Sequence, residues 1–359
     1  MKTLLEFGTL GLLSLLLALV CIPIIKKMAL KINLVDKPNY RKVHTTATPL
    51  IGGIAITTTT LVVLMASGNS FALLKEYLPM LASGCILLIV GVIDDKSDIR
   101  AKYKLGIQLL LACVVAFSGT RITTFYGFLG IYEIAVWAQY LLTIIVITGV
   151  VNAFNLMDGV DGLVGGLSLL GFTMFFISSV YFNDYFLGKI SIIFMGAIVG
   201  FLKFNLSKDK IFMGDAGSLF LGFILVTFGI HFMEKENHTN NYGYAYGFLL
   251  LVAFFSIPVL DSIRVYLGRI KQGNSPFKAD KSHLHHLLLT AGLTHKKISL
   301  FVTLFCMILF FLGFGLISFF STTLIILAIM ILFWTTVKIL LMISTLKDWR
   351  KTITVLEQQ

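Results

Sequence analysis

The chain contains little charge for its size. Charged residues make up only 13% of its 359 residues, whereas 57% are hydrophobic, and the mean hydropathy is +0.91. A soluble globular domain has roughly 25% charged residues, so this balance excludes an ordinary water-soluble fold. The composition indicates that a lipid bilayer surrounds most of the chain.

Cysteine is also scarce, and its positions form no pattern. The four cysteines, which all lie inside long apolar runs, are Cys21, Cys85, Cys113 and Cys306. They lack the paired spacing of a disulfide framework or a zinc site. A cleaved secretory signal is not expected either, because no small-residue cleavage site follows the first apolar run. We expect that run to be the first membrane span.

Long apolar runs dominate the rest of the sequence. A spanning helix needs about 20 apolar residues, and eleven runs approach that length. The predicted spans are residues 4–25, 50–68, 77–93, 105–119, 134–151, 162–182, 187–204, 216–233, 243–263, 299–320 and 321–346. Only Ser321, Thr322 and Thr323 separate the last two runs, so the number is eleven or ten. The predicted fold class is all-α, a polytopic membrane bundle that forms a single catalytic domain over residues 1–359.

The net charge of +11 reflects topology rather than nucleic-acid binding. When successive loops are assigned alternately to the two sides of the bilayer, 24 of the 29 Lys and Arg residues fall on one side. Basic residues accumulate in cytoplasmic loops. We therefore expect the N-terminus outside, the C-terminus in the cytoplasm and no nucleic-acid partner.

Aspartates gather on the same basic side. Ten of the twelve lie in or beside the predicted cytoplasmic loops near residues 26–49, 94–104, 152–161, 205–215 and 264–298: Asp36, Asp94, Asp95, Asp98, Asp158, Asp161, Asp209, Asp215, Asp261 and Asp280. The middles of the spans carry almost no ionisable residues, which disfavours a transporter. The pattern favours an enzyme active at the membrane surface, with a cation near its carboxylates.

The densest acidic segment ends the third span, where Gly-Val-Ile-Asp-Asp-Lys-Ser-Asp contains Asp94, Asp95 and Asp98. If the helix continues, Asp94 and Asp98 lie one turn apart on one face. Mg²⁺ binds through one or two carboxylates together with substrate phosphates, so this cluster favours Mg²⁺. The alternative is an acidic helix end exposed to solvent.

Two further loops combine aspartate with glycine. Asn-Leu-Met-Asp-Gly-Val-Asp-Gly at 155–162 precedes the sixth span, and Phe-Met-Gly-Asp-Ala-Gly-Ser at 212–218 opens the eighth. Glycine allows close approach of the backbone to a ligand, and the amides of a helix N-terminus attract anions. Ordinary turn chemistry is the alternative, since Asp161 and Asp215 could each cap the helix that follows.

The remaining cytoplasmic loops carry histidines and cations. Residues 280–286 read Asp-Lys-Ser-His-Leu-His-His, and residues 36–44 read Asp-Lys-Pro-Asn-Tyr-Arg-Lys-Val-His. No cysteine joins these histidines and their neighbours are basic, so we expect them to donate hydrogen bonds to phosphates rather than to bind zinc. For residues 280–286 the alternative is a loop that contacts lipid headgroups, and for residues 36–44 it is the positive charge that cytoplasmic loops ordinarily carry.

The ordered motifs resemble those of the polyprenyl-phosphate N-acetylhexosamine-1-phosphate transferases. They are Asp-x-Pro-x-x-Arg-Lys-x-His, Pro-x-x-Gly-Gly, Asp-Asp-x-x-Asp, Asn-x-x-Asp-Gly-x-Asp-Gly, Phe-Met-Gly-Asp-x-Gly-Ser and His-x-His-His, and they cover residues 35–286. The interruption of the histidines by Leu284 resembles the branch that uses UDP-GlcNAc. The peptidoglycan branch, which transfers phospho-MurNAc-pentapeptide, carries three consecutive histidines.

This resemblance implies transfer of GlcNAc-1-phosphate from UDP-GlcNAc to undecaprenyl phosphate at the cytoplasmic face of the bacterial inner membrane. It implies Mg²⁺ as the cofactor, with Mn²⁺ as an alternative, held by Asn155 and Asp215. The implied catalytic residues are Asp94, which would activate the lipid phosphate, Asp95 and Asp158. Substrate-binding residues expected from the resemblance or from their charge are Arg41, Lys42, His44, Lys102, Lys104, Asp161, Asn205, Phe212, His283, His285 and His286. The sequence is also compatible with a homodimer.

A second interpretation is an intramembrane prenyltransferase, in which residues 94–98 would hold a Mg²⁺-bound prenyl diphosphate. That enzyme would need a second motif of the same kind, and residues 155–161 fit it poorly. A transporter ranks third. Under the favoured interpretation, Asp209 and Asp261 have no expected role beyond the loops that contain them.

Overall fold

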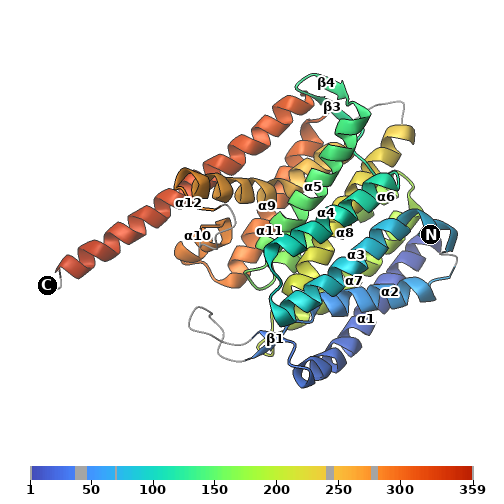
Figure 1. Cartoon of the computed structure of the whole chain (residues 1–359), viewed down its shortest axis with the longest axis horizontal. Helices are drawn as coiled ribbons and strands as arrows, with labels where there is room; N and C mark the ends of the chain where they lie inside the picture. Colours follow the sequence, from blue (N-terminus) through green and yellow to red (C-terminus); the bar gives the residue numbers. More distant parts are fainter. Residues whose placement is uncertain (1, 37–46, 69–70, 240–245, 276–281, 358–359) are drawn as a thin grey trace.

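The structure, a computed structural model, describes residues 2–36, 47–68, 71–239, 246–275 and 282–357. This part of the chain is a helical bundle with two short antiparallel hairpins (Figure 1). The helices are α1 (Lys2–Lys31), α2 (Gly52–Ala66), α3 (Phe71–Ser97), α4 (Ala101–Phe117), α5 (Val136–Leu156), α6 (Leu163–Tyr181), α7 (Tyr185–Asn205), α8 (Gly214–Thr239), α9 (Tyr246–Lys271), α10 (Leu284–Thr290), α11 (His295–Leu316) and α12 (Thr322–Glu357). The hairpins pair β1 (Val35–Asp36) with β2 (Thr48–Pro49) and β3 (Thr124–Phe128) with β4 (Ile131–Glu133).

The predicted polytopic helical architecture is confirmed. Each of the eleven apolar runs falls on one of α1 to α9, α11 and α12. Within the described residues, nine of these helices are long and apolar enough to cross a membrane, while α2 and α4 have only 15 and 17 residues. Residues 317–321 are not helical and separate α11 from α12, so the last two runs are separate helices. The direction of insertion stays a prediction.

Helix α8 lies at the centre of the bundle, where it packs against α2, α3, α5 and α9. Its side chains are buried on every face, as those of Phe220, Phe223 and Phe228 illustrate. A helix that is apolar all round belongs in the interior of a bundle. The first turn of α8, which contains Asp215, is therefore held from several sides.

Two glycines bring neighbouring helices against this first turn. A Cβ atom on Gly53 of α2 would collide with the backbone of Gly217, and one on Gly91 of α3 would collide with the backbone of Ala216. Only a residue without a side chain permits such close approach. The second glycine of the Pro-x-x-Gly-Gly motif thus serves helix packing next to Asp215.

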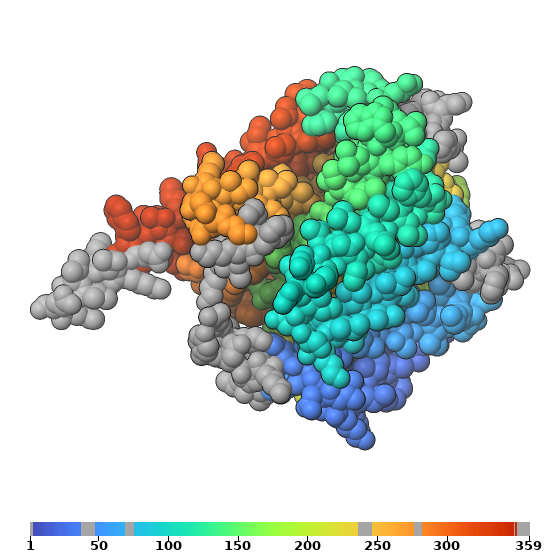
Figure 2. All heavy atoms as spheres, in the orientation of Figure 1, coloured from blue at the N-terminus to red at the C-terminus, as the bar shows by residue number. Residues whose placement is uncertain are grey.

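The two hairpins lie at opposite ends of the bundle. In Figure 1, β1 and α10 lie at one end and the β3–β4 hairpin lies at the other, while α12 projects beyond its neighbours. Figure 2 shows that the surface is hollowed between α4 and the C-terminal part of α9. Described residues from each of the loops predicted to be cytoplasmic lie at the end that carries α10, a short helix that the sequence did not predict.

Candidate active site

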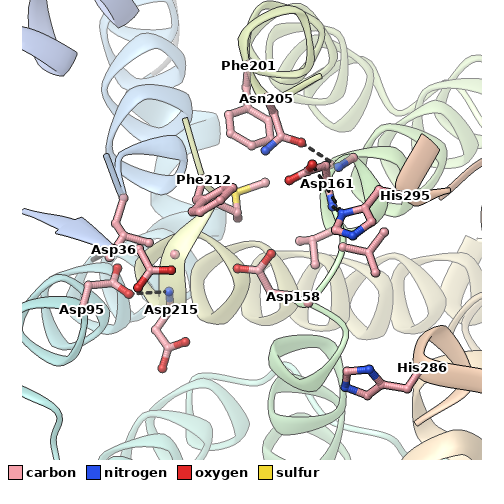
Figure 3. Close-up of a pocket in the computed structure, with 18 of the residues that line it drawn as sticks. Asp36, Asp95, Asp158, Asp161, Phe201, Asn205, Phe212, Asp215, His286 and His295 are labelled. Carbon is pink, nitrogen blue, oxygen red and sulfur yellow. Dashed lines mark hydrogen bonds and ion pairs between the residues drawn. The ribbon is translucent and has the colours of Figure 1, made fainter. Parts of the chain in front are cut away.

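A pocket of about 750 Å³ lies at the end of the bundle where these loops converge. Seven of the ten clustered aspartates line it: Asp36, Asp94, Asp95, Asp98, Asp158, Asp161 and Asp215. Asn205, Phe212 and His286, which were also predicted as site residues, line the same pocket (Figure 3). The structure thus brings together side chains from distant parts of the sequence.

Lys104 connects two of these carboxylates. Its ammonium nitrogen lies 2.5 Å from Oδ2 of Asp94 and 3.0 Å from Oδ2 of Asp215. Oδ1 of Asp94 also accepts a hydrogen bond from the backbone N–H of Ile99 at 2.6 Å. The side chains of Asp94 and Lys104 are only 6% and 21% exposed, and partial burial strengthens ion pairs. Asp94, Lys104 and Asp215 form what we term the charge cluster, shared by α3, α4 and α8.

Asp95 plays a different part from its neighbour. Its Oδ1 accepts a hydrogen bond from the backbone N–H of Asp215 at 2.8 Å, and its Oδ2 accepts one from Ala216 at 3.2 Å. These amides belong to the first turn of α8, where backbone donors have no partner within the helix. The cap that the sequence suggested for Asp215 is therefore supplied by Asp95, and the carboxylate of Asp215 is left to the charge cluster.

Asn155 adds a carboxamide to the surroundings of Asp215. From the last turn of α5, its Nδ2 lies 3.1 Å from Oδ1 of Asp215 and 2.8 Å from Oγ of Ser218. With the amide rotated by half a turn, the two residues would present oxygens to one cation, the ligand type that Mg²⁺ prefers. Among the described residues, no three His, Cys, Asp or Glu side chains are arranged to enclose an ion. A cation here would therefore take its remaining ligands from phosphate and water.

Asp158 lies near the middle of the pocket, between Asp215 and His295 in Figure 3. Burial raises the pKa of its carboxyl well above the usual range, and the negative charges of Asp215, Asp95 and Asp161 raise that pKa further. Like charges held this close disfavour full ionisation. The pocket is thus electrostatically suited to positive charge.

Asp161 belongs to an ion-pair cluster on another side of the pocket. Its Oδ2 pairs with Lys210 and lies 3.4 Å from Nδ1 of His295. Burial by itself raises the pKa of Asp161, but the hydrogen bonds from His295 and Lys210 bring that pKa below its usual value. Helix α6 begins after Gly162 without a side-chain cap, so the suggestion that Asp161 caps this helix is wrong.

Asn205 and Phe212 join the loops that border the pocket. The buried carboxamide of Asn205 accepts a hydrogen bond from the N–H of Gly162 at 2.6 Å and donates one to the carbonyl of Ile211 at 2.8 Å. The backbone N–H of Phe212 donates to the carbonyl of Pro49 at 2.8 Å. Both residues therefore shape the pocket as well as line it.

The three histidines of residues 280–286 occupy different environments. His286 lines the pocket, whereas His283 and His285 are buried behind it. Burial, together with the two neighbouring imidazoles, lowers the pKa of His285 to about 3, so that ring is uncharged at neutral pH. Of the three, only His286 is placed to meet a bound substrate.

Lys102, a cationic residue expected at the site, is not among the described residues that line the pocket. Lys102 is exposed, and its ammonium nitrogen lies 5.1 Å from the centre of the Tyr103 ring. Arg41, Lys42 and His44 lie outside the described residues. Their roles in substrate binding stay predictions.

Several proteins are similar in sequence to most of this chain. It is 32% identical to a probable undecaprenyl-phosphate N-acetylglucosaminyl 1-phosphate transferase of Bacillus subtilis (strain 168), over 79% of this chain and 77% of that protein. It is 32% and 31% identical to the undecaprenyl-phosphate alpha-N-acetylglucosaminyl 1-phosphate transferases of Yersinia pestis and Escherichia coli (strain K12), in each case over 80% of this chain and 78% of the relative. Residues 77–233 match the model of glycosyl transferase family 4. The chain belongs to glycosyl transferase family 4.

The matched segment of this family 4 protein contains most of the pocket. It includes Asp94, Asp95, Lys104, Asn155, Asp158, Asp161, Asn205, Phe212 and Asp215. The family predicted from the motifs is confirmed, and the protein is a multi-pass membrane phosphoglycosyltransferase.

Sequence reasoning missed three residues of this family 4 protein. His295 lines the pocket and Lys210 pairs with Asp161. Asp261 was expected to be an idle loop residue, but it is fully buried and bonded to His283. A signal for Asp261 did exist, because an aspartate inside an apolar helix needs partners for its charge. His295 and Lys210 carried no comparable signal, since each resembles an ordinary basic loop residue.

Proposed function

We propose that the protein transfers GlcNAc-1-phosphate from UDP-GlcNAc to undecaprenyl phosphate, which gives undecaprenyl-diphospho-GlcNAc and UMP. The observation that carries this proposal is the charge cluster of Asp94, Lys104 and Asp215, at the end of a membrane bundle. There a water-soluble nucleotide sugar can meet the headgroup of a lipid. The names of the relatives point to the same acceptor and the same transferred group.

In this reaction an oxygen of the lipid phosphate attacks the sugar-bearing phosphorus of UDP-GlcNAc. The bond from that phosphorus to the UMP oxygen breaks, and UMP leaves with the electron pair. Both reactants are anions, so catalysis depends on positioning and on positive charge near the phosphates. Lys104 supplies one positive charge, and Asp94 beside it accepts any proton that the lipid phosphate carries.

We further propose Mg²⁺ as the cofactor, with Mn²⁺ as an alternative and with Asn155 and Asp215 as the protein ligands. The donor set fits, because it offers carboxylate and carboxamide oxygens and leaves room for phosphate oxygens. When bound, the ion would polarise the diphosphate and stabilise the charge that develops on UMP. The protein itself would position the ion, since Asp95 fixes the turn of α8 on which Asp215 lies.

The donor nucleotide is proposed to bind on the side of the pocket away from the charge cluster. Phe212 offers an aromatic side chain, while Asp161 and Asn205 are held in fixed orientations by Lys210, His295 and backbone groups. We place the reaction at the cytoplasmic face of the bacterial inner membrane, because 24 of the 29 Lys and Arg residues lie on that side in the predicted topology.

The test is UMP release from UDP-GlcNAc and undecaprenyl phosphate by purified Asp94→Asn and Asp215→Asn in detergent. We expect each variant to lose roughly 10²-fold or more in kcat, and chelation of divalent cations to stop the wild-type reaction. Asp209→Asn is the matched control, because its side chain is 90% exposed and pairs with Lys26. Wild-type turnover in Asp94→Asn and Asp215→Asn, with unfolding temperatures equal to the control's, would remove the support for this site.

A panel of UDP-sugars, each offered to the wild-type protein with undecaprenyl phosphate, tests the choice of donor separately. We expect UDP-GlcNAc to give the highest kcat/KM. Preference for UDP-MurNAc-pentapeptide would place the protein in the peptidoglycan branch instead.

A further inference from the structure

Asp261 is a fully buried carboxylate that the proposed reaction does not use. It lies in the C-terminal half of α9, behind the pocket, with 0% of its surface exposed. A buried charge is costly unless charged groups and hydrogen-bond donors surround it. The partners of Asp261 therefore identify the segments that its charge connects.

Among the described residues, the hydrogen-bond and ion-pair partners of Asp261 lie on α9 or at the start of α10. Oδ2 lies 2.9 Å from Nδ1 of His283, and both carboxylate oxygens lie 3.1 Å from the backbone nitrogen of Leu284, which donates to them. Arg264 donates to Oδ1 at 2.7 Å and also to the carbonyl of Ser282. One carboxylate and one guanidinium thus tie residues 282–284 to α9.

The segment held in this way carries two further histidines toward the pocket. The rings of His283 and His285 are parallel, with centroids 6.0 Å apart, and the centroid of His286 lies 4.3 Å from that of His285. His286 lines the pocket. Any shift at Leu284, the first residue of α10, would move His285 and His286 together, because a helical turn is rigid over so few residues.

His285 in turn supports the loop that carries Asp158 and Asp161. A Cβ atom on Gly159 would lie only 2.7 Å from Nε2 of His285, so the ring packs directly against the backbone of that loop. The ring is uncharged and makes a close-packed contact rather than an ion pair. A continuous set of contacts therefore runs from Asp261, through α10, to the two aspartates.

We propose that Asp261 is a positioning residue for donor binding. It fixes the start of α10 so that His286 faces the pocket and His285 holds the 158–161 loop from behind. This role rests on the proposed function, which identifies that side of the pocket as the donor side. The charge cluster of Asp94, Lys104 and Asp215 is held separately, by α3, α4 and α8.

The proposal predicts a specific split of kinetic constants. Displaced donor-side groups weaken the binding of substrate and of transition state alike, which raises the KM for the donor more than it lowers kcat. We expect Asp261→Asn, which keeps the shape but loses the charge, to raise the KM for UDP-GlcNAc about tenfold. The KM for undecaprenyl phosphate should stay as in the wild type. A merely structural defect would lower the active fraction, and hence the apparent kcat, without this selectivity.

Gly159→Ala tests the same set of contacts from its other end. Its new methyl group would displace His285, so we expect the same selective rise in the KM for UDP-GlcNAc. In the double variant the two effects should be less than multiplicative, because both act through α10. Glu234→Gln is the matched control. Glu234 is a buried carboxylate near the C-terminal end of α8, and it accepts hydrogen bonds from Thr123. This variant should leave both KM values unchanged.

An unchanged KM for UDP-GlcNAc in Asp261→Asn would overturn the role, as would equal rises for both substrates. If Asp261→Asn does not fold, Gly159→Ala with an unchanged donor KM would overturn it as well. Failure of the proposed function would look different, because the wild-type protein itself would then release no UMP from UDP-GlcNAc.

Discussion

Replacement of Lys104 by methionine should change Mg²⁺ affinity and turnover in opposite directions. Two unit charges 4 Å apart interact by about 4 kcal/mol at an effective dielectric constant of 20. The side chain of Asp215 is 32% exposed, so we allow roughly half of this, about 2 kcal/mol, for solvent screening. Loss of the ammonium should therefore strengthen cation binding at Asp215 by roughly 30-fold. It also removes positive charge from the reacting phosphates, which should lower kcat by about 10²-fold.

The assay is UMP release at saturating substrates during a titration with Mg²⁺. Lys104→Met should reach half-saturation at a lower Mg²⁺ concentration than the wild type while it turns over more slowly. Lys104→Arg, which keeps the charge, should retain the wild-type Mg²⁺ requirement. Lys96→Met, at an exposed lysine near the end of α3, should change neither quantity. If Lys104→Met matches the wild type in both, the charge cluster does not act on the bound cation and the reasoning is refuted.

Three smaller perturbations test other parts of the site. Gly53→Ala places a methyl group against Gly217 and should destabilise the fold by roughly 1–3 kcal/mol, measured as a lower Tm than that of Gly106→Ala, where a Cβ meets open space. His295→Ala should raise the KM for UDP-GlcNAc about tenfold because it removes a pocket wall, and an unchanged KM would contradict that placement. Asp95→Asn keeps only one acceptor oxygen for the start of α8 and should lower Tm and kcat together, with about 1 kcal/mol lost from the cap.

The bundle could be predicted from hydropathy because the bilayer allows few solutions. Backbone groups in lipid must be satisfied within a helix or a closed barrel, so long apolar runs become helices. Helix α10 escaped prediction because its seven residues are too few to show a helical period. The strands β1 and β2 were missed for a similar reason, since each has two residues. Helix α12 continues to Glu357, beyond the predicted end of the last span at 346, because its polar extension carries no hydropathy signal.

The site was predictable as a set of residues but not as a set of contacts. The alternation of loops between two sides placed the aspartates at one end of the bundle, and seven of them share one pocket. Sequence could not show that Asp95 caps α8, because its partners lie about 120 positions further along the chain. It also could not show that Asp261 holds His283 and the start of α10, since the sequence of a helix does not reveal which loop packs against it.

The adjacent residues Asp94 and Asp95 illustrate how one helix end serves both chemistry and architecture. Successive side chains on a helix point about 100° apart, so Asp94 meets Lys104 while Asp95 meets the first turn of α8. Asp215 is therefore bound to α3 twice, through its amide by Asp95 and through its carboxylate by the lysine that Asp94 also holds. A movement of α3 against α8 would break both connections. In the proposed reaction, an in-line displacement would need acceptor and donor groups at a fixed separation, and this double attachment of Asp215 would hold that separation.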